Sequence, residues 1–175
     1  MKSLTKAVIA IVFIVWGGKV FSEDKTPNLI ITGTVTTDSC NVDTDSQNLK
    51  VPLGDVVTGR FVRVGDTSPS QKFNITLTDC DTGVKGASIT FSGTSDSDNP
   101  DLLQITRDSG AASGIAVEIM DETSGSPVPL GKATTTKALT PGENSLPYSL
   151  RYKSTLGIVT AGSANAVMFF DLTYQ

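Results

Sequence analysis

The two cysteines carry the most evident chemistry in this sequence. Cys40 and Cys80 are the only cysteines among 175 residues, and the chain has no histidine. In an oxidising compartment an isolated pair of cysteines favours a disulfide, although two free buried thiols remain an alternative. A zinc site has little support, because two thiolates alone do not complete a zinc ligand shell. We therefore predict a disulfide between Cys40 and Cys80 and no metal site.

The remaining polar side chains do not form an evident catalytic set. Without histidine, Ser-His-Asp and Cys-His catalysis are excluded. The 96–101 stretch, Asp-Ser-Asp-Asn-Pro-Asp, has the acid spacing of a calcium loop but lacks the central glycine and terminal glutamate of an EF-hand. Most other carboxylates lie in turn-like segments, and we expect Asp79 and Asp81 to face solvent. The sequence predicts neither an enzyme nor a cofactor.

The first 22 residues have the features of a targeting segment. Lys2 and Lys6 precede an uninterrupted apolar run over residues 7–16. This run is too short to span a bilayer, but it has the length of the hydrophobic region of a signal peptide. We place the cleavage after Ser22, so residues 1–22 are predicted to be a signal peptide and the rest of the chain to be exported.

Removing residues 1–22 makes the chain more acidic. Three of its fourteen basic side chains lie in that segment, and all eighteen acidic ones follow it, which leaves a net charge of −7. A surface of this charge repels phosphate backbones and anionic lipid headgroups. We therefore expect no nucleic-acid partner and no membrane insertion after signal cleavage.

The rest of the chain reads as short strands separated by turn residues. In each expected strand, β-branched or apolar residues alternate with polar ones, and clusters of Gly, Pro, Asn, Asp and Ser lie between them. No amphipathic pattern of helical period and length follows the signal segment. An antiparallel β-sandwich of one domain is the predicted fold. The expected strands are residues 29–35, 49–53, 73–78, 87–91, 115–119, 128–130 and 146–152.

The C-terminal segment 162–175 shows the longest alternation. Its apolar residues recur with the period of two that a strand with one buried face requires. They are Gly162, Ala164, Ala166, Met168, Phe170, Leu172 and Tyr174. Val167 and Phe169 break the polarity of the other face. The sequence continues for one residue after Tyr174, so we expect the far edge of this strand to remain open to another chain. The alternative is an ordinary strand of a complete sandwich.

These residues, taken together, resemble a known family. The mature sequence is similar to the chaperone–usher fimbrial (pilus) subunits, in particular to the type 1 fimbrial major-subunit (pilin) family. Two features are specific in combination, a glycine fourteenth from the end (Gly162) and a penultimate tyrosine (Tyr174). The other matching segments are Gly33-Thr-Val before Cys40, Phe73 to Cys80, Phe91-Ser-Gly, Gly114-Ile-Ala-Val with Asp121, Leu150-Arg-Tyr152, residues 160–166 and residues 171–175.

The resemblance implies an all-β, incomplete immunoglobulin-like antiparallel sandwich that lacks its last strand and carries an N-terminal donor-strand extension. Residues 23–33 are then the extension and residues 34–175 the pilin domain. The expected function is that of a structural subunit that polymerises by donor-strand exchange. The product is a bacterial surface fimbria used in adhesion. The implied partners are a periplasmic pilus chaperone, an outer-membrane usher, and copies of itself or sister subunits.

Donor and acceptor residues can be assigned from the alternation. The acceptor groove, which the chaperone also contacts, is expected along the apolar file from Gly162 to Tyr174. The donor strand is expected to use its odd-numbered positions, which are Pro27, Leu29, Ile31, Gly33 and Val35. A self-contained secreted adhesive β-sandwich that binds a host ligand is the alternative. It is disfavoured because the mature chain has no tryptophan for a sugar-binding surface. A self-contained module would, in addition, have no need of a spare N-terminal strand.

Overall fold

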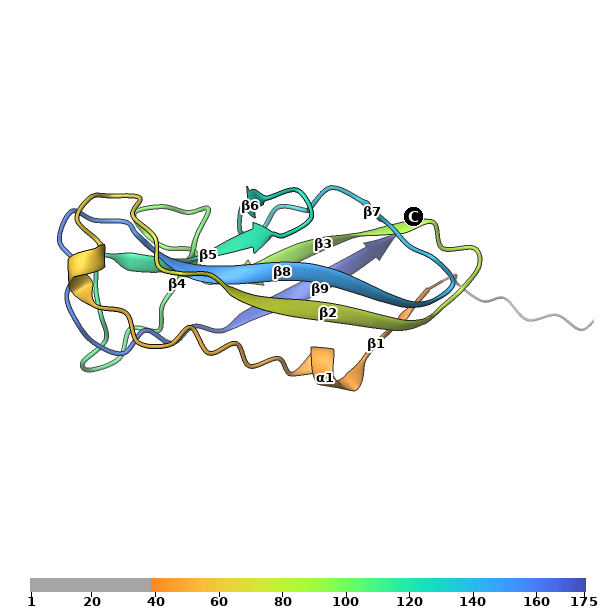
Figure 1. Ribbon diagram of the computed structural model, residues 1–175, viewed down its shortest axis with the longest axis horizontal. Coiled ribbons are helices and arrows are strands. Elements are labelled where there is room, and N and C mark those ends of the chain that lie inside the picture. Colours follow the sequence, from red (N-terminus) through yellow and green to blue (C-terminus); the bar gives the residue numbers. More distant parts are fainter. Residues whose placement is uncertain (1–38) are drawn as a thin grey trace, which may run out of the picture. The chain divides into compact units, whose positions relative to one another are not determined.

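A computed structural model describes residues 39–175 of the chain. The described part is an antiparallel β-sandwich (Figure 1). The predicted signal peptide (1–22), the predicted donor residues and the domain boundary at residue 34 lie outside the described residues. None of the helices within residues 39–175 is long and apolar enough to cross a membrane.

Two sheets form the sandwich. The larger sheet has the order β1 (Asn41–Val42), β2 (Gln71–Cys80), β8 (Gly142–Ser154), β5 (Ile115–Asp121) and β4 (Leu103–Gln104), and β6 (Ser126–Val128) also pairs with β5. The smaller sheet has the order β7 (Lys137–Ala138), β3 (Gly86–Gly93) and β9 (Met168–Tyr174). A short helix α1 (Thr44–Gln47) and a 3-10 turn η1 (Thr58–Arg60) lie between β1 and β2. All strand pairs within these sheets are antiparallel.

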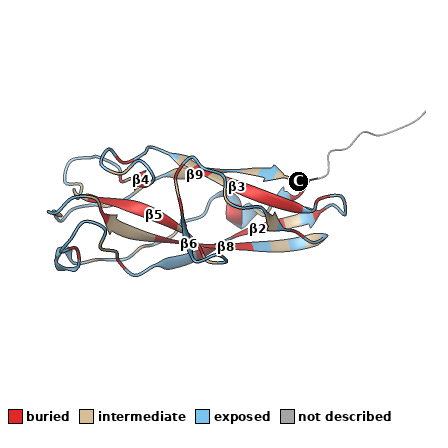
Figure 2. Cartoon of the chain, turned by 90° about the horizontal axis from the view of Figure 1, so that it is seen from above, coloured by how far each residue is buried: buried red, intermediate tan, exposed pale blue. Residues whose placement is uncertain are grey.

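The core lies between the two sheets. β2 contributes Ile75 and Leu77 and β3 contributes Ile89 and Phe91, all buried, because alternate residues of a strand point to the same face. Tyr148 of β8 meets the edge of Phe91, with ring centroids 5.1 Å apart. Buried residues accordingly follow the strands as bands along the interior of the sandwich (Figure 2).

The long strands were predicted correctly from the sequence, and one short predicted strand is absent from the described residues. The predicted strands at 73–78, 87–91, 115–119 and 146–152 lie within β2, β3, β5 and β8, and 128–130 overlaps the end of β6. The predicted strand at 49–53 is wrong, because these residues have no ladder partner among the described residues. The two-residue strands β1, β4 and β7 were not predicted, since so few residues show no period.

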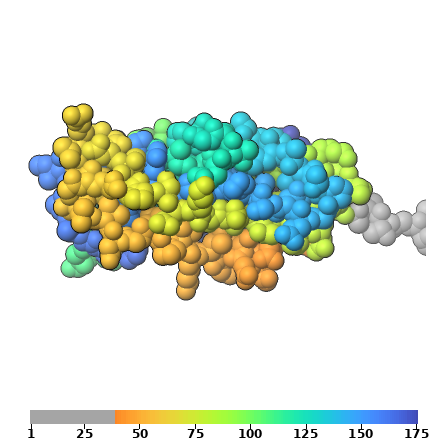
Figure 3. All heavy atoms as spheres, viewed as in Figure 1, coloured from red at the N-terminus to blue at the C-terminus, as the bar shows by residue number. Residues whose placement is uncertain are grey.

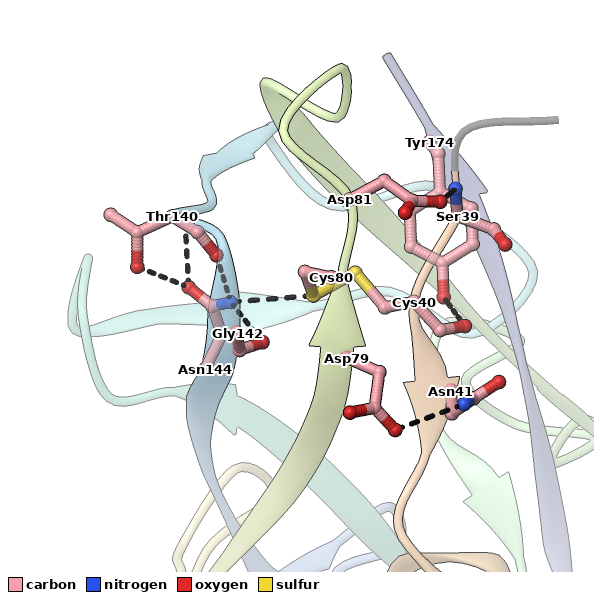
Figure 4. The surroundings of a disulfide bond; sticks show 10 residues. All are labelled: Ser39, Cys40, Asn41, Asp79, Cys80, Asp81, Thr140, Gly142, Asn144 and Tyr174. Carbon is pink, nitrogen blue, oxygen red and sulfur yellow. Dashed lines mark hydrogen bonds between the residues drawn. A yellow bond between two sulfur atoms is a disulfide. The ribbon is translucent and has the colours of Figure 1, made fainter. Parts of the chain in front are cut away.

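The predicted disulfide between Cys40 and Cys80 is confirmed (Figure 4). It joins the residue before β1 to the last residue of β2, where the β2–β8 register shifts between Leu77 and Cys80. Asp79 lies in this irregularity with a φ of 50°. As expected, Asp79 and Asp81 are exposed, and they accept hydrogen bonds from Asn41 Nδ2 and from the Ser39 N–H.

The calcium-like stretch is a turn organised by its own first aspartate. Asp96 is buried, and its Oδ1 accepts hydrogen bonds from the N–H groups of Asp98 and Asn99, each at 3.1 Å. One carboxylate oxygen is thereby engaged with the backbone, and Asp98 and Asp101 are exposed. The spacing of acids that suggested a cation loop has a local explanation, since aspartate often closes such turns through its side chain.

Two buried carboxylates on β5 bind lysine or arginine side chains of neighbouring segments. Glu118 accepts from Arg151 Nε and Lys153 Nζ of β8, both at 2.6 Å. Asp121 accepts from Lys137 Nζ at 2.7 Å. Burial raises the pKa of the Asp121 carboxyl, but the bonds from Lys137 and from backbone N–H groups outweigh burial and hold the pKa below its usual value. These three ion pairs link β5 to other segments.

Replacing Glu118 with glutamine should destabilise the sandwich. The substitution leaves the half-buried Arg151 and Lys153 without a counter-charge, which costs about 1.5–3 kcal/mol of unfolding free energy. Glu122→Gln is the matched control, because its ion-pair partner Lys72 is exposed and such pairs contribute little, and because the amide oxygen can still accept from the Ser149 hydroxyl. Chemical denaturation of both variants measures the difference, and equal stabilities would contradict the assigned role of Glu118.

Tyr148 is buried without a partner for its hydroxyl. No hydrogen bond to this oxygen is found within residues 39–175, although the nearby Thr134 hydroxyl, which accepts from the Ile89 N–H, partly offsets the effect of burial on the pKa of Tyr148. Burial raises the pKa of Tyr148 to about 12. The folded state therefore keeps a proton that the unfolded state releases near pH 10, and stability is lost as the pH rises through this window.

Tyr148→Phe should reduce this alkaline loss without destabilising the protein at neutral pH. Removing an unpartnered buried hydroxyl is neutral or stabilising, whereas Tyr152→Phe, which loses a hydrogen bond to Ala164, should cost about 1 kcal/mol. Thermal unfolding between pH 8 and pH 12 tests the pair. An unchanged alkaline slope in Tyr148→Phe would show that other groups cause the loss.

Candidate functional site

A long apolar groove runs between two segments of the described chain. One side is formed by residues 40–61 and the other by residues 159–170, and the cavity volume is about 1300 Å³. Its floor consists of core side chains from both sheets, namely Phe73, Phe91, Leu103, Ile115, Val117, Leu150 and Tyr152. In Figure 3 the orange residues of the first segment line the lower side of the visible face, and the yellow residues lie at its left end. These floor side chains are buried except for the half-buried Tyr152, and the apolar side chains that remain partly accessible belong to the walls.

The strand β9 forms one wall of this groove and is paired on one edge. β3 is its ladder partner, with Ala87 opposite Tyr174 and Gly93 opposite Met168. Gln175 and Gly86 exchange two backbone hydrogen bonds. Hydrogen-bonded pairs alternate along an antiparallel ladder, so the odd-numbered residues of β9 bond to β3. The N–H and C=O groups of the even-numbered residues therefore point to the other edge, where no strand lies within residues 39–175.

The same parity continues before β9 begins. The carbonyl of Ser163 accepts from the Ala112 N–H at 2.8 Å, and the carbonyl of Asn165 accepts from the Thr106 N–H at 2.6 Å. Backbone groups of Ser163 and Asn165 thus bond to neighbouring loops, as those of the odd-numbered residues of β9 bond to β3. The unpaired backbone edge therefore extends over the even-numbered residues of the segment, apart from the Ala164 carbonyl, which accepts a hydrogen bond from Tyr152 Oη.

The even-numbered side chains face the core, as the alternation suggested. Each is half-buried and packs on the core cluster, whereas the odd-numbered residues are exposed. They are Ala164, Ala166, Met168, Phe170, Leu172 and Tyr174. One prediction needs correction, since the regular strand begins at Met168 and not at Gly162. β3 ends at Gly93, opposite Met168, so residues 162–167 have no ladder partner there and bond to loop residues instead.

Gly162 is exposed and lies close to another backbone segment. A Cβ atom at this position would collide with backbone atoms of Gly110, Ala111 and Ala112. Ser163 bridges Ala111 in parallel, and the Ser163 N–H donates to the Gly110 carbonyl. Glycine is therefore required where the chain enters the groove wall, and the side-chain pattern alone did not indicate this steric reason.

Two tyrosine hydroxyls hold this wall in place. Tyr152 Oη of β8 donates to the carbonyl of Ala164 at 2.8 Å, and Tyr174 Oη donates to the carbonyl of Cys40 at 3.1 Å (Figure 4). Burial raises the pKa of both tyrosines. The second bond links the end of β9 to the disulfide and closes the groove there. Sequence reasoning missed Tyr152, because a tyrosine in a strand gives no sign of its hydroxyl partner.

The opposite wall is the segment that was predicted as a strand. Val51, Leu53 and Val56 are half-buried against the core, and their neighbours along the chain are mostly exposed. Neither Val51 nor Leu53 makes a backbone hydrogen bond within residues 39–175. The alternation at 49–53 thus correctly indicated which side chains face the core. The prediction that this segment pairs as a strand was wrong. The predicted donor residues, Pro27 to Val35, lie outside the described residues.

Comparison with known proteins identifies the family. The family model described as "Fimbrial protein" matches residues 29–175. This chain belongs to the fimbrial protein family. It is 36% identical over 177 residues to the "Probable major fimbrial subunit LpfA" of Escherichia coli O157:H7, which covers all of this chain and 98% of that protein.

Solved structures of fimbrial subunits share the fold. A type I fimbria protein of Burkholderia pseudomallei is 37% identical, with a TM-score of 0.62 over 79% of this chain and 91% of that chain. The P pilus rod subunit PapA is 27% identical, with a TM-score of 0.65 over 78% of this chain and 99% of that one. The fimbrial protein is therefore a structural subunit of a fimbria on the cell surface, with the immunoglobulin-like sandwich expected from its sequence.

Substituting Gly162 tests the steric role of this position. Gly162→Ala should lower the free energy of unfolding by about 1–3 kcal/mol, because the colliding atoms belong to the backbone and cannot move aside cheaply. Gly157→Ala is the matched control, since a Cβ atom there meets open space. Denaturant titration of both variants measures the difference. A Gly162→Ala protein as stable as the control would contradict the close approach.

Proposed function

We propose that the groove is the seat of a β-strand donated by another subunit, and that this exchange polymerises the fimbrial protein. The observation that carries the proposal is the unpaired edge of β9 beside an open apolar groove. A strand inserted there would bond to the free backbone groups of the even-numbered residues of 162–174 and would cover the half-buried apolar side chains of the groove walls. It would also lie next to Val51 and Leu53, which could become its second ladder partners.

The donor is the N-terminal segment 23–35 of the next subunit. Its odd-numbered residues Leu29, Ile31 and Val35 face the groove floor, and Gly33 lies where the donor backbone approaches the floor closely. Full burial of the three apolar side chains contributes roughly 5–9 kcal/mol. Each main-chain hydrogen bond adds about 1 kcal/mol net, and the entropy cost of association is subtracted. The sum supports tight binding.

The same arrangement supports a filament. Donor and acceptor are different surfaces of one chain, so the contact is head-to-tail and generates an open polymer unless the rotation closes a ring. The family places the product outside the cell. We infer that the chain passes through the periplasm, where a pilus chaperone fills the groove first, and that an outer-membrane usher is the place of exchange. These partners follow from the resemblance to chaperone–usher subunits.

We assign no catalytic activity to the chain. The buried carboxylates Glu118 and Asp121 are engaged in ion pairs that join strands, and Asp96 closes a turn. The cysteines form a disulfide. Each of these side chains thus has a structural partner, which supports a purely structural subunit.

A peptide covering residues 23–35 should stabilise a truncated chain that begins at Val35. Binding to the folded state alone raises the unfolding free energy by about 4 kcal/mol at a thousandfold excess over the dissociation constant. Thermal unfolding with and without the peptide measures the effect. A truncated chain that is already stable and indifferent to the peptide would instead favour a complete, self-contained adhesive sandwich.

Two altered peptides test which face of the donor is buried. A peptide with Leu29→Asp and Ile31→Asp should lose the stabilising effect, because it would place two charges on the groove floor. A peptide with Asn28→Asp and Ile30→Asp carries the same number of changes on the other face and should retain most of it. The reverse result would show that the even-numbered residues face the groove.

A further inference from the structure

Donor-strand insertion, if it occurs as proposed above, fixes which end of a second copy meets this one. All pairs within the sheets are antiparallel, and antiparallel pairing is the more stable arrangement per residue. A donor antiparallel to β9 ends near residue 162, where the wall of the acceptor begins. Between Val35 and Ser39 the chain can span about 14 Å at most. The body of the donor copy therefore lies against this end of the acceptor.

This end of the acceptor carries exposed apolar side chains that its own fold does not cover. We name it the arginine pole and define it by Arg60, Val62, Arg63, Val64, Leu156 and Ile158. Val62, Val64 and Ile158 are 71%, 64% and 79% exposed. Two loops form the pole and are joined by backbone bonds, since the Gly65 N–H donates to the Ser154 carbonyl and the Ser154 N–H to Asp66. In Figure 3 both loops, yellow and blue, lie at the left end.

The charges of the arginine pole are mostly free to meet a partner. Arg60 and Arg63 are exposed. Asp66 turns towards its own loop, where its carboxylate accepts from the N–H groups of Val62 and Arg63, both at 2.7 Å. Asp108 accepts from the Ser163 hydroxyl. These bonds hold the two carboxylates towards their own subunit, and neither Arg60 nor Arg63 forms an ion pair within residues 39–175.

The end of the donor that follows its N-terminal segment has the opposite charge. We name it the disulfide pole and define it by Ser39, Cys40, Asp79, Cys80, Asp81 and Glu143. Asp79, Asp81 and Glu143 are exposed. Gly142 pairs with Cys80, which brings Glu143 beside the disulfide. The ammonium group of the nearby Lys85 donates a hydrogen bond to the carbonyl of Thr82 within its own loop. This end is acidic where the arginine pole is basic.

We propose that the arginine pole of one copy docks on the disulfide pole of the next copy along the filament. The contact pairs Arg60 and Arg63 with Asp79, Asp81 and Glu143, and it covers Val62, Val64 and Ile158. It is separate from the groove, because the exposed side chains of the pole do not line it. Complementary charges at such a rim chiefly raise the association rate and make it salt-dependent. The covered valines and isoleucine slow dissociation.

Charge reversal on the mature full-length chain tests this contact. The chain is refolded, and its growth into polymers is followed by light scattering at low salt and at about 0.5 M salt, where exposed charges are screened. Arg60→Glu with Arg63→Glu should slow growth about tenfold at low salt and have little effect at high salt. Lys132→Glu, an exposed reversal in the 129–132 turn, is the control and should grow as the unaltered chain does.

Rescue identifies the partner surface. Adding Glu143→Lys to the doubly reversed chain lowers the charge of the acidic set Asp79, Asp81 and position 143 from −3 to −1. This weakens the repulsion between the two poles and should recover part of the lost rate. Growth of the doubly reversed chain at the normal rate at every salt concentration, or a slowing that Glu143→Lys deepens, overturns the proposal. A matching loss in Lys132→Glu also overturns it, because the effect would then be one of net charge.

Binding of the 23–35 peptide separates this proposal from the one on which it rests. The doubly reversed chain, truncated to begin at Val35, should bind the peptide as tightly as the unaltered truncated chain, since the pole does not line the groove. If the truncated chains bind the peptide normally but the unaltered full-length chain polymerises at the same rate at every salt concentration, the pole contact alone is overturned. Failure of the unaltered chain to bind the peptide overturns donor insertion and the pole contact with it.

Discussion

The half-satisfied backbone of β9 is the constraint on which the rest of this structure depends. A strand in a protein core needs hydrogen-bond partners on both edges, because each unpaired polar group that is removed from water costs free energy. β9 bonds to β3 on one edge and has no ladder partner on the other within the described residues. The even-numbered residues combine that unpaired backbone with side chains turned to the core, so one occupant can satisfy both.

The remainder of the sandwich supplies a firm frame around this open side. Glu118 and Asp121 link β5 to other segments through buried charges, and the two tyrosine hydroxyls fix the groove wall at its two ends. Buried ion pairs of this kind contribute less to stability than their number suggests, since desolvation offsets attraction. Their effect here is geometric. They hold the strands that form the floor of the groove in register.

Much of this architecture was predictable from the sequence, and the reasons for the failures are physical. The long strands and the half-buried face of 164–174 follow from a period of two, which a sequence displays directly. The disulfide follows from two lone cysteines. The pairing of 49–53 was not predictable, because the hydrogen-bond partner of a strand lies elsewhere in the chain or outside it. Contacts of single atoms, such as Tyr152 with Ala164 or Asp96 with its turn, leave no periodic trace either.

The disulfide has a mechanical consequence for a filament under tension. In the proposed polymer, a pulling force transmitted through the donor strand would enter the body of a subunit at Ser39 and Cys40. The bond from Cys40 to Cys80 passes that force directly to the end of β2, so the segment before β2, residues 41–70, carries little of it. From β2 the load spreads into β8 along a long antiparallel ladder. Its strands are loaded along their length, so many hydrogen bonds share the force instead of opening one after another.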